Sequence, residues 1–458
     1  MWFDVSSKIF IHDPTPDVIS WCKEYLVIDN PDYIKKSRMG LWTGNTPRTF
    51  SLYERIGYDL VVPFGCLYDL HERYSEYTFK SHIKPLQAIN YNSHINPYDY
   101  QEKAIQKAVG ARNGILVMPC GSGKTNCGLE IISRIGLPAL WLTHTQDLLN
   151  QSMNRAKSVL DISPSSYGTI TGGRVNIGSG ITFATVQTMS KIDLNQYKDL
   201  WGCIIVDECH KAVGTPTKAM QFYSVLSRLS CRYKYGLTAT PKRADGMEKT
   251  MFALLGDIAC EVPREAVADT TCPVKVRTIR TGYVPNYDIA LCGDGTINYA
   301  GLVDDLTHNK ERFNLVRSVV DNNCDGPTLV LGNRVEYLQA LSNESCKNSI
   351  CLSAMGTSKA AKAERKDALR KLNNGELDAV FCTYQLAAEG LDCPNLKYVV
   401  FATPEKDPTR IQQASGRVGR KAEGKKWGIV IDFIDDFGMY KGWWKKRLSV
   451  YKKLGYDI

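Results

Sequence analysis

The chain has 458 residues, of which 43% are hydrophobic and 23% charged; this length predicts two to four domains, and the composition excludes a disordered chain. No apolar run approaches the roughly 20 residues of a membrane span, and the start does not read as a signal peptide, so we expect a cytoplasmic protein with no membrane partner. The 15 cysteines include no CxxC pair, so we expect no disulfide framework and no structural metal. The net charge of +9 suits a polyanionic partner, although a basic solvated surface would give the same value.

Residues 1–90 are rich in aromatic and turn-forming residues and show no long helical period. They fit neither of the two sheet patterns that follow them in the chain. We therefore predict a small N-terminal accessory domain over residues 1–90, a candidate for DNA binding.

Between residues 91 and 262, short apolar runs alternate with longer amphipathic segments. Short apolar runs separated by helical patterns are typical of strands that are covered on both faces. They predict an α/β fold with a parallel sheet and right-handed crossovers. The predicted strands are Gly114–Met118, Ala139–Thr143, Cys203–Val206 and Lys234–Leu237.

A glycine-rich turn, residues 119–125, follows the first of these strands and precedes a helical pattern. Glycines leave room for backbone N–H groups to surround a triphosphate at a helix N-terminus. Lys124 can place its ammonium on the β and γ phosphates, and the Thr125 hydroxyl can ligate Mg²⁺. A full P-loop would carry glycine at position 118, where this chain has Met118. The predicted ATP-binding residues of the turn are Gly121, Ser122, Gly123, Lys124 and Thr125.

An acidic pair, Asp207 and Glu208, ends a later strand of the same series. Asp207 can hold Mg²⁺, while Glu208 can orient or deprotonate an attacking water. An acidic pair that stands alone is more often part of a surface loop. Its position after the glycine-rich turn favours hydrolysis of a nucleoside triphosphate.

A second series of strands occupies residues 263–436 and carries no phosphate loop. Two similar lobes, only one of them with a phosphate loop, predict a nucleotide site in the cleft between them. The predicted strands are Thr328–Leu331, Ala379–Thr383, Tyr398–Ala402 and Gly428–Asp432. Residues 437–458 predict a basic aromatic helix, in which Trp443 and Trp444 either pack within the protein or stack on bases.

The ordered motifs between about residues 95 and 435 resemble those of superfamily 2 helicases and translocases. Residues 207–210, which read DECH, are similar to the DExH branch, and residues 237–241, LTATP, resemble motif III. The resemblance implies two RecA-like lobes, ATP and Mg²⁺ as cofactors, nucleic acid as the partner, and adenine recognition by Gln101. The residues that it implies in coupling hydrolysis to the nucleic-acid track are His210, Thr238 and Thr240.

Further motifs of this family imply contacts with nucleic acid. Residues 142–151 resemble motif Ia, and residues 383–392 resemble motif V. The implied contacts are Thr143, Gly173, Thr185, Gln187 and Thr383. Lys242 and Arg243, directly after motif III, are candidates for contacting a duplex junction, because phosphates bind cations.

Residues 413–420, QASGRVGR, resemble motif VI. A guanidinium fork suits a developing phosphoryl charge better than an ammonium, so Arg417 and Arg420 are the expected arginine fingers, which the second lobe supplies when the cleft closes. The other residues implied to face the nucleotide from this lobe are Gly390, Asp392 and Gln413.

Within the accessory domain, residues 40–44 and 60–65 resemble the module of T4-type phage recombination helicases, the UvsW-like group. This resemblance implies remodelling of branched DNA by fork regression, branch migration or R-loop removal in recombination, repair or replication. We therefore expect a monomeric ATP-dependent DNA helicase or translocase that acts on forked or branched DNA. The alternatives are a DExH RNA helicase, the motor subunit of a restriction or remodelling system, and an ATP-gated nucleic-acid clamp that does not unwind.

Overall fold

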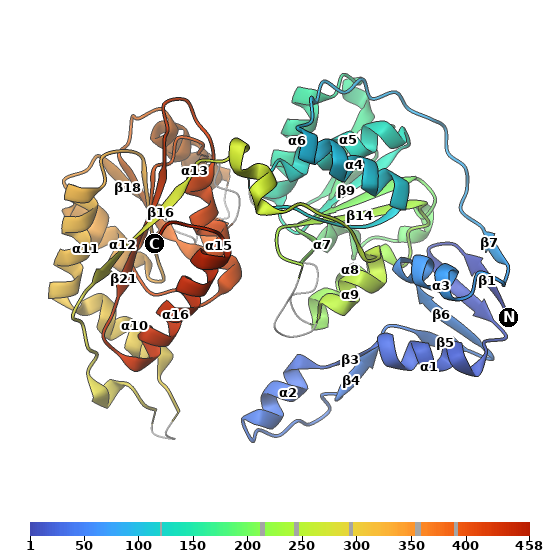
Figure 1. Cartoon of the computed structure of the whole chain (residues 1–458), viewed down its shortest axis with the longest axis horizontal. Helices are drawn as coiled ribbons and strands as arrows, with labels where there is room; N and C mark the ends of the chain where they lie inside the picture. The colour runs from blue at the N-terminus through green and yellow to red at the C-terminus, as the bar shows by residue number, and fades with distance from the viewer. Residues whose placement is uncertain (120, 211–215, 242–246, 293–295, 353–358, 389–392) are drawn as a thin grey trace. The chain divides into compact units, whose positions relative to one another are not determined.

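The computed structural model describes the whole chain except residues 120, 211–215, 242–246, 293–295, 353–358 and 389–392. The chain divides into two compact units (Figure 1). Unit 1 comprises Met1–Pro119 and Gly123–Pro263, and unit 2 comprises Cys120–Ser122 and Arg264–Ile458. The main division after Pro263 lies next to the boundary expected between the two lobes.

Unit 1 contains an eight-stranded sheet in the order β11-β10-β12-β9-β13-β14-β8-β15. Its pairs are parallel except for the antiparallel pair of β10 and β11. The strands are β8 (Asn113–Val117), β9 (Ala139–Thr143), β10 (Tyr167–Thr171), β11 (Arg174–Asn176), β12 (Ile181–Thr185), β13 (Cys203–Asp207), β14 (Tyr233–Thr238) and β15 (Ile258–Glu261). The helices are α4 (Asp99–Ala111), α5 (Lys124–Ile135), α6 (Gln146–Val159), α7 (Val186–Met189), α8 (Pro216–Leu226) and α9 (Glu248–Leu255). The predicted parallel sheet of the first lobe is confirmed, and every residue of β9, β12 and β13 is buried, as expected of strands covered on both faces.

The N-terminal residues form a five-stranded sheet in the order β5-β6-β2-β1-β7 and a two-stranded ribbon of β3 and β4. The elements are β1 (Trp2–Val5), β2 (Lys8–His12), α1 (Pro16–Tyr25), β3 (Val27–Asp29), α2 (Pro31–Arg38), β4 (Thr49–Ser51), β5 (Glu54–Ile56), β6 (Asp59–Pro63), η1 (Phe64–Cys66), α3 (Leu67–Arg73) and β7 (Phe79–Ser81). This small domain shares one hydrophobic core with the first lobe. A Cβ atom on Gly65 would lie 2.5 Å from the carbonyl oxygen of Ala253, so glycine is required for this close approach. The accessory module is therefore packed on the first lobe, although the sequence suggested a separate one.

Unit 2 is built on a six-stranded sheet in the order β16-β21-β20-β17-β19-β18, in which every pair is parallel. The strands are β16 (Val274–Arg280), β17 (Thr328–Gly332), β18 (Ser349–Leu352), β19 (Ala379–Thr383), β20 (Tyr398–Phe401) and β21 (Gly428–Ile434). The helices are α10 (Tyr299–His308), α11 (Lys310–Asn323), α12 (Val335–Glu344), α13 (Lys359–Asn373), α14 (Tyr384–Ala388), α15 (Pro408–Gly416) and α16 (Gly438–Lys453). The four strands predicted for the second lobe are confirmed as β17, β19, β20 and β21.

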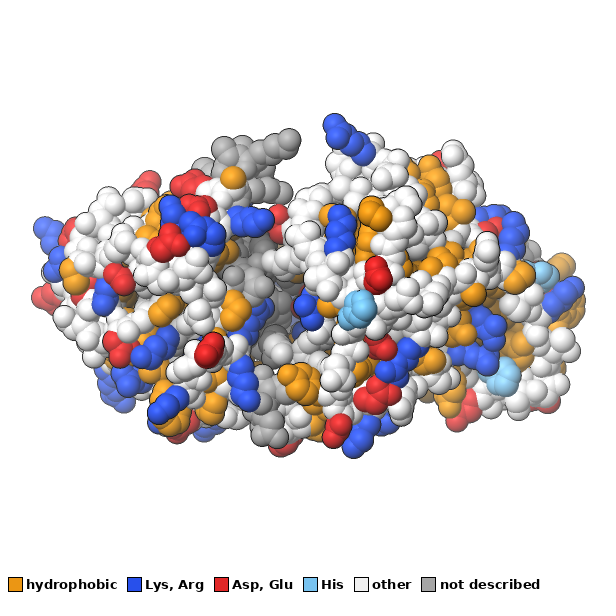
Figure 2. Space-filling model, turned by 90° about the horizontal axis from the view of Figure 1, so that it is seen from above, with side chains coloured by type: hydrophobic (Ala, Val, Ile, Leu, Met, Phe, Trp, Pro, Cys, Tyr) orange, Lys and Arg blue, Asp and Glu red, His pale blue; other side chains and the backbone are white. Residues whose placement is uncertain are grey.

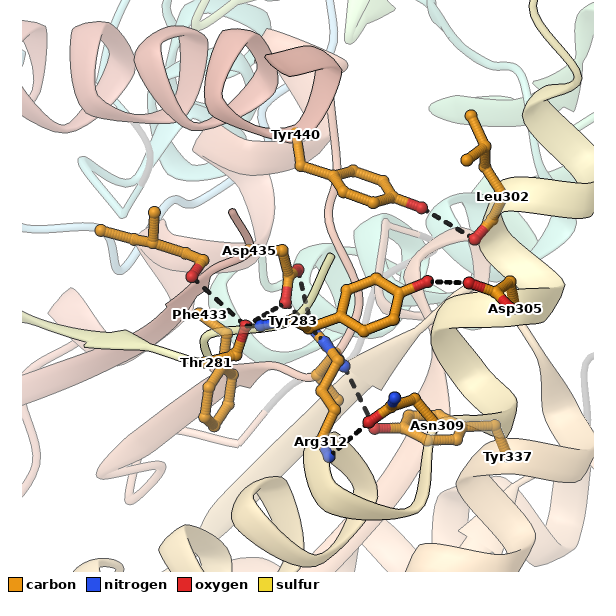
Figure 3. A network of polar contacts seen from close by, with 12 residues as sticks. Thr281, Tyr283, Leu302, Asp305, Asn309, Arg312, Tyr337, Phe433, Asp435 and Tyr440 are labelled. Atoms are coloured by element: carbon orange, nitrogen blue, oxygen red, sulfur yellow. Dashed lines mark hydrogen bonds and ion pairs between the residues drawn. The ribbon is translucent and has the colours of Figure 1, made fainter. Parts of the chain in front are cut away.

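A buried polar network joins the sheet of unit 2 to the helices beside it (Figure 3). The Arg312 guanidinium of α11 donates to both carboxylate oxygens of Asp435, over 2.7 and 3.1 Å. It also donates to the Tyr337 hydroxyl over 3.3 Å, and the Thr281 hydroxyl donates to Asp435 over 2.7 Å. Because Arg312 and Asp435 are each 1% exposed, their charges are stabilised by each other rather than by water.

The C-terminal helix α16 is part of unit 2. Its Arg447 is 1% exposed and donates to the Asp432 carboxylate over 2.7 Å. Trp443 stacks on Tyr299 with the ring centroids 6.3 Å apart, and Trp444 is partly buried against the core. These contacts correspond to the packing interpretation of the two tryptophans, and they remove Arg447 from the basic surface.

Charged side chains of both signs are mixed on the surface shown in Figure 2, and most cysteines lie inside the protein. On the face drawn in Figure 2, Lys and Arg side chains are interspersed with Asp and Glu rather than gathered in one continuous patch. Most of the described cysteines are buried, and all of them are free thiols. Within the described part of the chain, none of the helices combines the length and the apolar character that a membrane span requires.

Candidate active site

The glycine-rich turn connects the buried strand β8 to helix α5. Gly121 and Gly123 have φ angles of 82° and 79°, which lie in the left-handed region that glycine adopts without strain. Helix α5 begins at Lys124 with no side chain capping its N-terminus, so its first N–H groups are suited to an anionic ligand. Met118 is fully buried, and its N–H donates to the carbonyl of Thr238 over 2.8 Å. Met118 therefore belongs to the core. A full P-loop has glycine at this position, but the left-handed φ angles that require glycine are at Gly121 and Gly123.

Gln101 lies against this turn. A Cβ atom on Gly123 would be 2.5 Å from the Gln101 amide nitrogen, so a larger residue at position 123 would displace the end of the Gln101 side chain. Gln101 is 3% exposed, and its side-chain oxygen accepts the N–H of Tyr98 over 3.0 Å at the start of α4. The structure thus brings the predicted adenine-reading residue to the predicted phosphate turn, as the order of the motifs implied.

The acidic pair lies opposite the lysine of the turn. The Lys124 Nζ is 3.9 Å from Glu208 Oε1. Asp207 ends strand β13 and is 6% exposed; one of its carboxylate oxygens accepts the N–H of Glu208 over 3.0 Å, and the Ser152 hydroxyl donates to the other over 3.5 Å. Burial, and secondarily the charge of Glu208, raises the pKa of Asp207 to about 7.

The oxygen ligands at this end of the sheet fit Mg²⁺ together with a triphosphate. The hydroxyl of Thr125, in the first turn of α5, and the carboxylate of Asp207 are both ligand types that Mg²⁺ prefers. Among the described residues, no group of three or more His, Cys, Asp or Glu side chains could hold a metal. Mg²⁺ is usually held by one or two carboxylates, with substrate phosphates and water as its remaining ligands, and Asp207 is of this ligand type.

The acidic box contacts motif III directly. The His210 Nδ1 is 2.9 Å from the Thr238 hydroxyl and 3.3 Å from a carboxylate oxygen of Glu208. The Thr238 oxygen also accepts the N–H of Thr240 over 3.0 Å. His210 and Thr238 are 4% and 0% exposed, so their contact is shielded from water. The structure therefore places the three predicted coupling residues in one chain of contacts that begins at Glu208.

The candidate nucleic-acid residues of the first lobe lie at or beyond the ends of neighbouring strands. Thr143 of β9 and Thr185 of β12 pair directly at the carboxyl ends of these strands. Both are buried, and the Thr143 hydroxyl donates to the carbonyl of Thr145 over 2.9 Å, so a contact between Thr143 and nucleic acid would require a change in this bond. Gln187 donates to the carbonyl of His144 over 2.9 Å, and Gly173 is exposed in the turn between β10 and β11.

In unit 2, Thr383 ends β19, and its hydroxyl accepts the N–H of Leu386 over 3.4 Å. Gln413 is half-buried on α15, and Arg420 is half-buried just beyond it. Arg417 is 9% exposed, and its guanidinium donates to the carbonyl of Ala387. The remaining predicted site residues lie outside the described part of the chain: Lys242, Arg243, Gly390 and Asp392.

Asn333 and Arg334, which were not among the predicted site residues, lie at the same edge of this sheet. Gly332 of β17 pairs with Thr383 of β19, so Asn333 and Arg334, which follow Gly332, lie at the strand end that carries Thr383. Arg334 is bonded to Asp304 over 2.7 Å. The sequence signal that could have pointed to them is a pair of polar residues, Asn and Arg, between a buried strand and a helix.

Comparison with known proteins agrees with the two-lobed architecture. Residues 94–243 match the family model described as type III restriction enzyme, res subunit, and residues 311–422 match the helicase conserved C-terminal domain. A protein of Acanthamoeba polyphaga mimivirus, named as ATP-dependent RNA helicase L396, is 28% identical over 82% of this chain and 70% of its own length. The DNA 3'-5' translocase XPB2 of Sulfurisphaera tokodaii is 24% identical over 73% of this chain and 81% of its own length.

Solved structures share this fold at low sequence identity. The ATP-dependent Type ISP restriction-modification enzyme LlaBIII bound to DNA matches 79% of this chain and 30% of its own chain, with a TM-score of 0.58 and 19% identity. T4 UvsW matches 100% of this chain and 98% of its own, with a TM-score of 0.42 and 18% identity, so the UvsW-like subfamily stays a prediction. On the motifs, the two matched domains and the relatives, the chain belongs to the ATP-dependent helicases of superfamily 2.

Proposed function

We propose that this helicase uses ATP hydrolysis to remodel forked or branched DNA, by fork regression, branch migration or unwinding of duplexes and R-loops. The observation that carries the motor function is the contact of His210 with both Glu208 and Thr238. It joins the predicted hydrolysis residue to the end of strand β14, from which motif III continues. A change at the γ-phosphate can therefore reach the following segment through two side-chain contacts.

The chain's own residues have distinct roles in this proposal. The glycine-rich turn and the N-terminus of α5 bind the phosphates through backbone N–H groups, and Lys124 offsets their negative charge. Glu208 orients the attacking water and accepts its proton. Arg417 and Arg420 are proposed to stabilise the charge that develops on the transferred phosphoryl group.

Bound Mg²⁺ would neutralise phosphate charge, and Thr125 and Asp207 are the residues proposed to hold it. Burial raises the pKa of Asp207, which favours the protonated form of this carboxyl when no cation is bound. Loading of the site should therefore release a proton from Asp207. The Ser152 hydroxyl donates to this carboxylate over 3.5 Å.

Three observations support DNA as the cargo. The first lobe matches a restriction-enzyme family, one of the similar proteins is named as a DNA translocase, and LlaBIII was solved bound to DNA. The accessory module that precedes the lobes provides an additional surface for a branched substrate. One relative is named as an RNA helicase, so RNA is the alternative nucleic-acid substrate.

Parallel measurement of ATP turnover with three nucleic acids tests this proposal. The wild-type protein is assayed with forked DNA, single-stranded DNA and single-stranded RNA of matched sequence and length. We expect forked DNA to stimulate turnover most. Stronger stimulation by RNA would support the RNA helicase alternative, and ATP-dependent binding without stimulated turnover would support a clamp.

A further inference from the structure

The accessory module carries a projection that takes no part in the hydrophobic core. It consists of residues 31–49, which join β3 to β4 and include helix α2, and we call it the 31–49 protrusion. In Figure 1 its helix extends away from the five-stranded sheet of the module. None of these residues is buried, so burial of apolar surface does not explain why the segment adopts an ordered shape.

Polar and backbone hydrogen bonds hold the protrusion together instead. The Asn30 side chain caps α2 by accepting the N–H of Asp32 over 3.0 Å, and it donates to the carbonyl of Pro47 over 2.9 Å. The Lys36 ammonium donates to the Thr46 hydroxyl over 2.8 Å, which links the helix to the segment that leads to β4. The protrusion is therefore a defined structural element rather than a loose loop.

Trp42 lies at the end of this element and is 88% exposed. Its six-membered ring lies against Gly44, where an added Cβ would be 2.8 Å from the ring. Gly44 has a φ of 51°, so both the backbone conformation and the close approach favour glycine. Met39 and Leu41 beside it are 58% and 54% exposed. The indole thus lies over Gly44 while most of its surface faces solvent, at the cost of leaving apolar area in water.

The charge of the 31–49 protrusion is mainly positive. It carries four cations and one carboxylate, Asp32, in the first turn of α2. Lys35, Arg38 and Arg48 are exposed, and the ion pairs of the described residues include none of the three. An exposed aromatic face on the same small element as these cations complements an anionic backbone that carries flat, unstacked rings.

We propose that the 31–49 protrusion binds an unpaired nucleic-acid strand, with a base stacked on Trp42 and phosphates at Lys35, Arg38 and Arg48. This inference rests on the proposed function, since it supplies the contact for a single-stranded arm of a branched substrate. Unpaired bases are required because a base inside a duplex presents no free face to an indole. The surplus of cations argues against an apolar protein partner, which would gain nothing from three unpaired positive charges.

Substitution of the exposed ring tests the stacking contact. Trp42→Ala, Trp42→Phe and Tyr58→Ala are compared by fluorescence anisotropy on labelled forked DNA, single-stranded DNA, single-stranded RNA and a blunt DNA duplex. Tyr58 is the matched control, because it is 84% exposed in the same module. Trp42→Ala should weaken binding to the strands with unpaired bases by roughly 5- to 150-fold, with little change on the blunt duplex. Trp42→Phe should retain most of the affinity, and Tyr58→Ala should bind like the wild type.

The RNA and DNA arms distinguish which kind of strand the protrusion accepts. Equal binding by Trp42→Ala and the wild type on every probe would overturn the inference, as would an equal loss on the blunt duplex. The double variant Lys35→Ala/Arg38→Ala should lower the salt dependence of binding, with a slope smaller by roughly one for each lost phosphate contact. If no nucleic acid stimulates ATP turnover by the wild type, the proposed function fails; if stimulation is normal and Trp42→Ala is unchanged, only the role of the protrusion fails.

Discussion

At the residue scale, the proposed hydrolysis site concentrates features that are unfavourable without a ligand. Glu208 has a φ of 48°, a left-handed backbone that costs a residue with a side chain about 1–3 kcal/mol. Its neighbour Asp207 is a buried carboxyl with a raised pKa. Both features lie beside Lys124, at the end of the sheet where phosphates and Mg²⁺ are expected. Binding of the substrate would offset these costs, which explains their location.

Replacement of Lys124 by alanine should abolish ATP turnover and leave nucleic-acid binding largely intact. The Lys124 ammonium lies 3.9 Å from Glu208, and it is predicted to hold the phosphates. Turnover is measured by phosphate release and binding by anisotropy. Lys103→Ala, an exposed lysine on α4, serves as the control and should behave like the wild type. Normal turnover by Lys124→Ala would contradict the assignment of the glycine-rich turn.

Replacement of His210 by alanine should separate hydrolysis from its stimulation by nucleic acid. The variant removes the contacts of His210 with both Thr238 and Glu208 and leaves Lys124 and the glycine turn unchanged in sequence. We expect stimulation by forked DNA, expressed relative to the basal turnover of the variant itself, to fall by roughly 5- to 150-fold, the range of a typical coupling free energy. Turnover is measured with and without DNA. Equal stimulation in the variant and the wild type would remove His210 from the coupling path.

At the element scale, Lys234 of β14 is a buried cation where the accessory module packs on the first lobe. It is fully buried, donates to the carbonyl of Leu226 over 3.1 Å, and lies 4.5 Å from the centre of the Phe64 ring. Burial lowers its pKa from 10.5 to about 8. Because the folded state binds the proton less well than the unfolded state, stability is highest above pH 10.5 and is lost as the pH falls through 8.

Lys234→Met should therefore raise the free energy of unfolding at pH 7 by about 1–3 kcal/mol, because a methionine of similar length removes the cost of burying the charge. The gain should shrink as the pH rises from 8 towards 10.5, where the lysine is neutral in both states. Urea unfolding at pH 7 and pH 10 measures both values, with Lys103→Met as the exposed control. A gain of the same size at both pH values would show that packing, not charge, is responsible.

In unit 2, the buried ion pair of Arg312 and Asp435 connects α11 to the residues that follow β21 (Figure 3). Arg312→Ala should lower the free energy of unfolding by roughly 3–5 kcal/mol, since it leaves the Asp435 charge buried without its partner. Arg317→Ala on the same helix breaks only an exposed pair with Glu344 and should cost no more than about 1 kcal/mol. Chemical denaturation followed by circular dichroism compares the two. Equal losses would contradict the difference in burial.

At the scale of the whole molecule, the features that could be predicted from the sequence are those encoded by residues close together in the chain. Strands such as β9 and β19 are short apolar runs whose buried faces appear directly in the sequence, and the glycine turn and the acidic box are contiguous motifs. The close approach of Gly65 to Ala253 was not predictable, because residues so far apart in the chain reveal no contact in a single sequence.

The C-terminal helix shows a second reason why some features could not be predicted from the sequence. Its run of lysines and Arg447 reads as a basic surface, yet Arg447 shares a buried helix face with Tyr440 and Tyr451, seven residues before it and four after. The phase of that face is set by Asp432, which lies on a strand outside the helix. The projection around Trp42 was visible as a short motif, but its exposure and its hydrogen bonds are properties of the fold.

The central claim is that ATP hydrolysis by this chain drives the remodelling of branched DNA. The most direct test incubates the protein with a labelled four-way DNA junction and a labelled fork, with and without ATP, and resolves the products on a native gel. We predict ATP-dependent conversion of these substrates by the wild type and none by Lys124→Ala. Intact junctions in the presence of a wild-type protein that hydrolyses ATP, or conversion that proceeds without ATP, would contradict the claim.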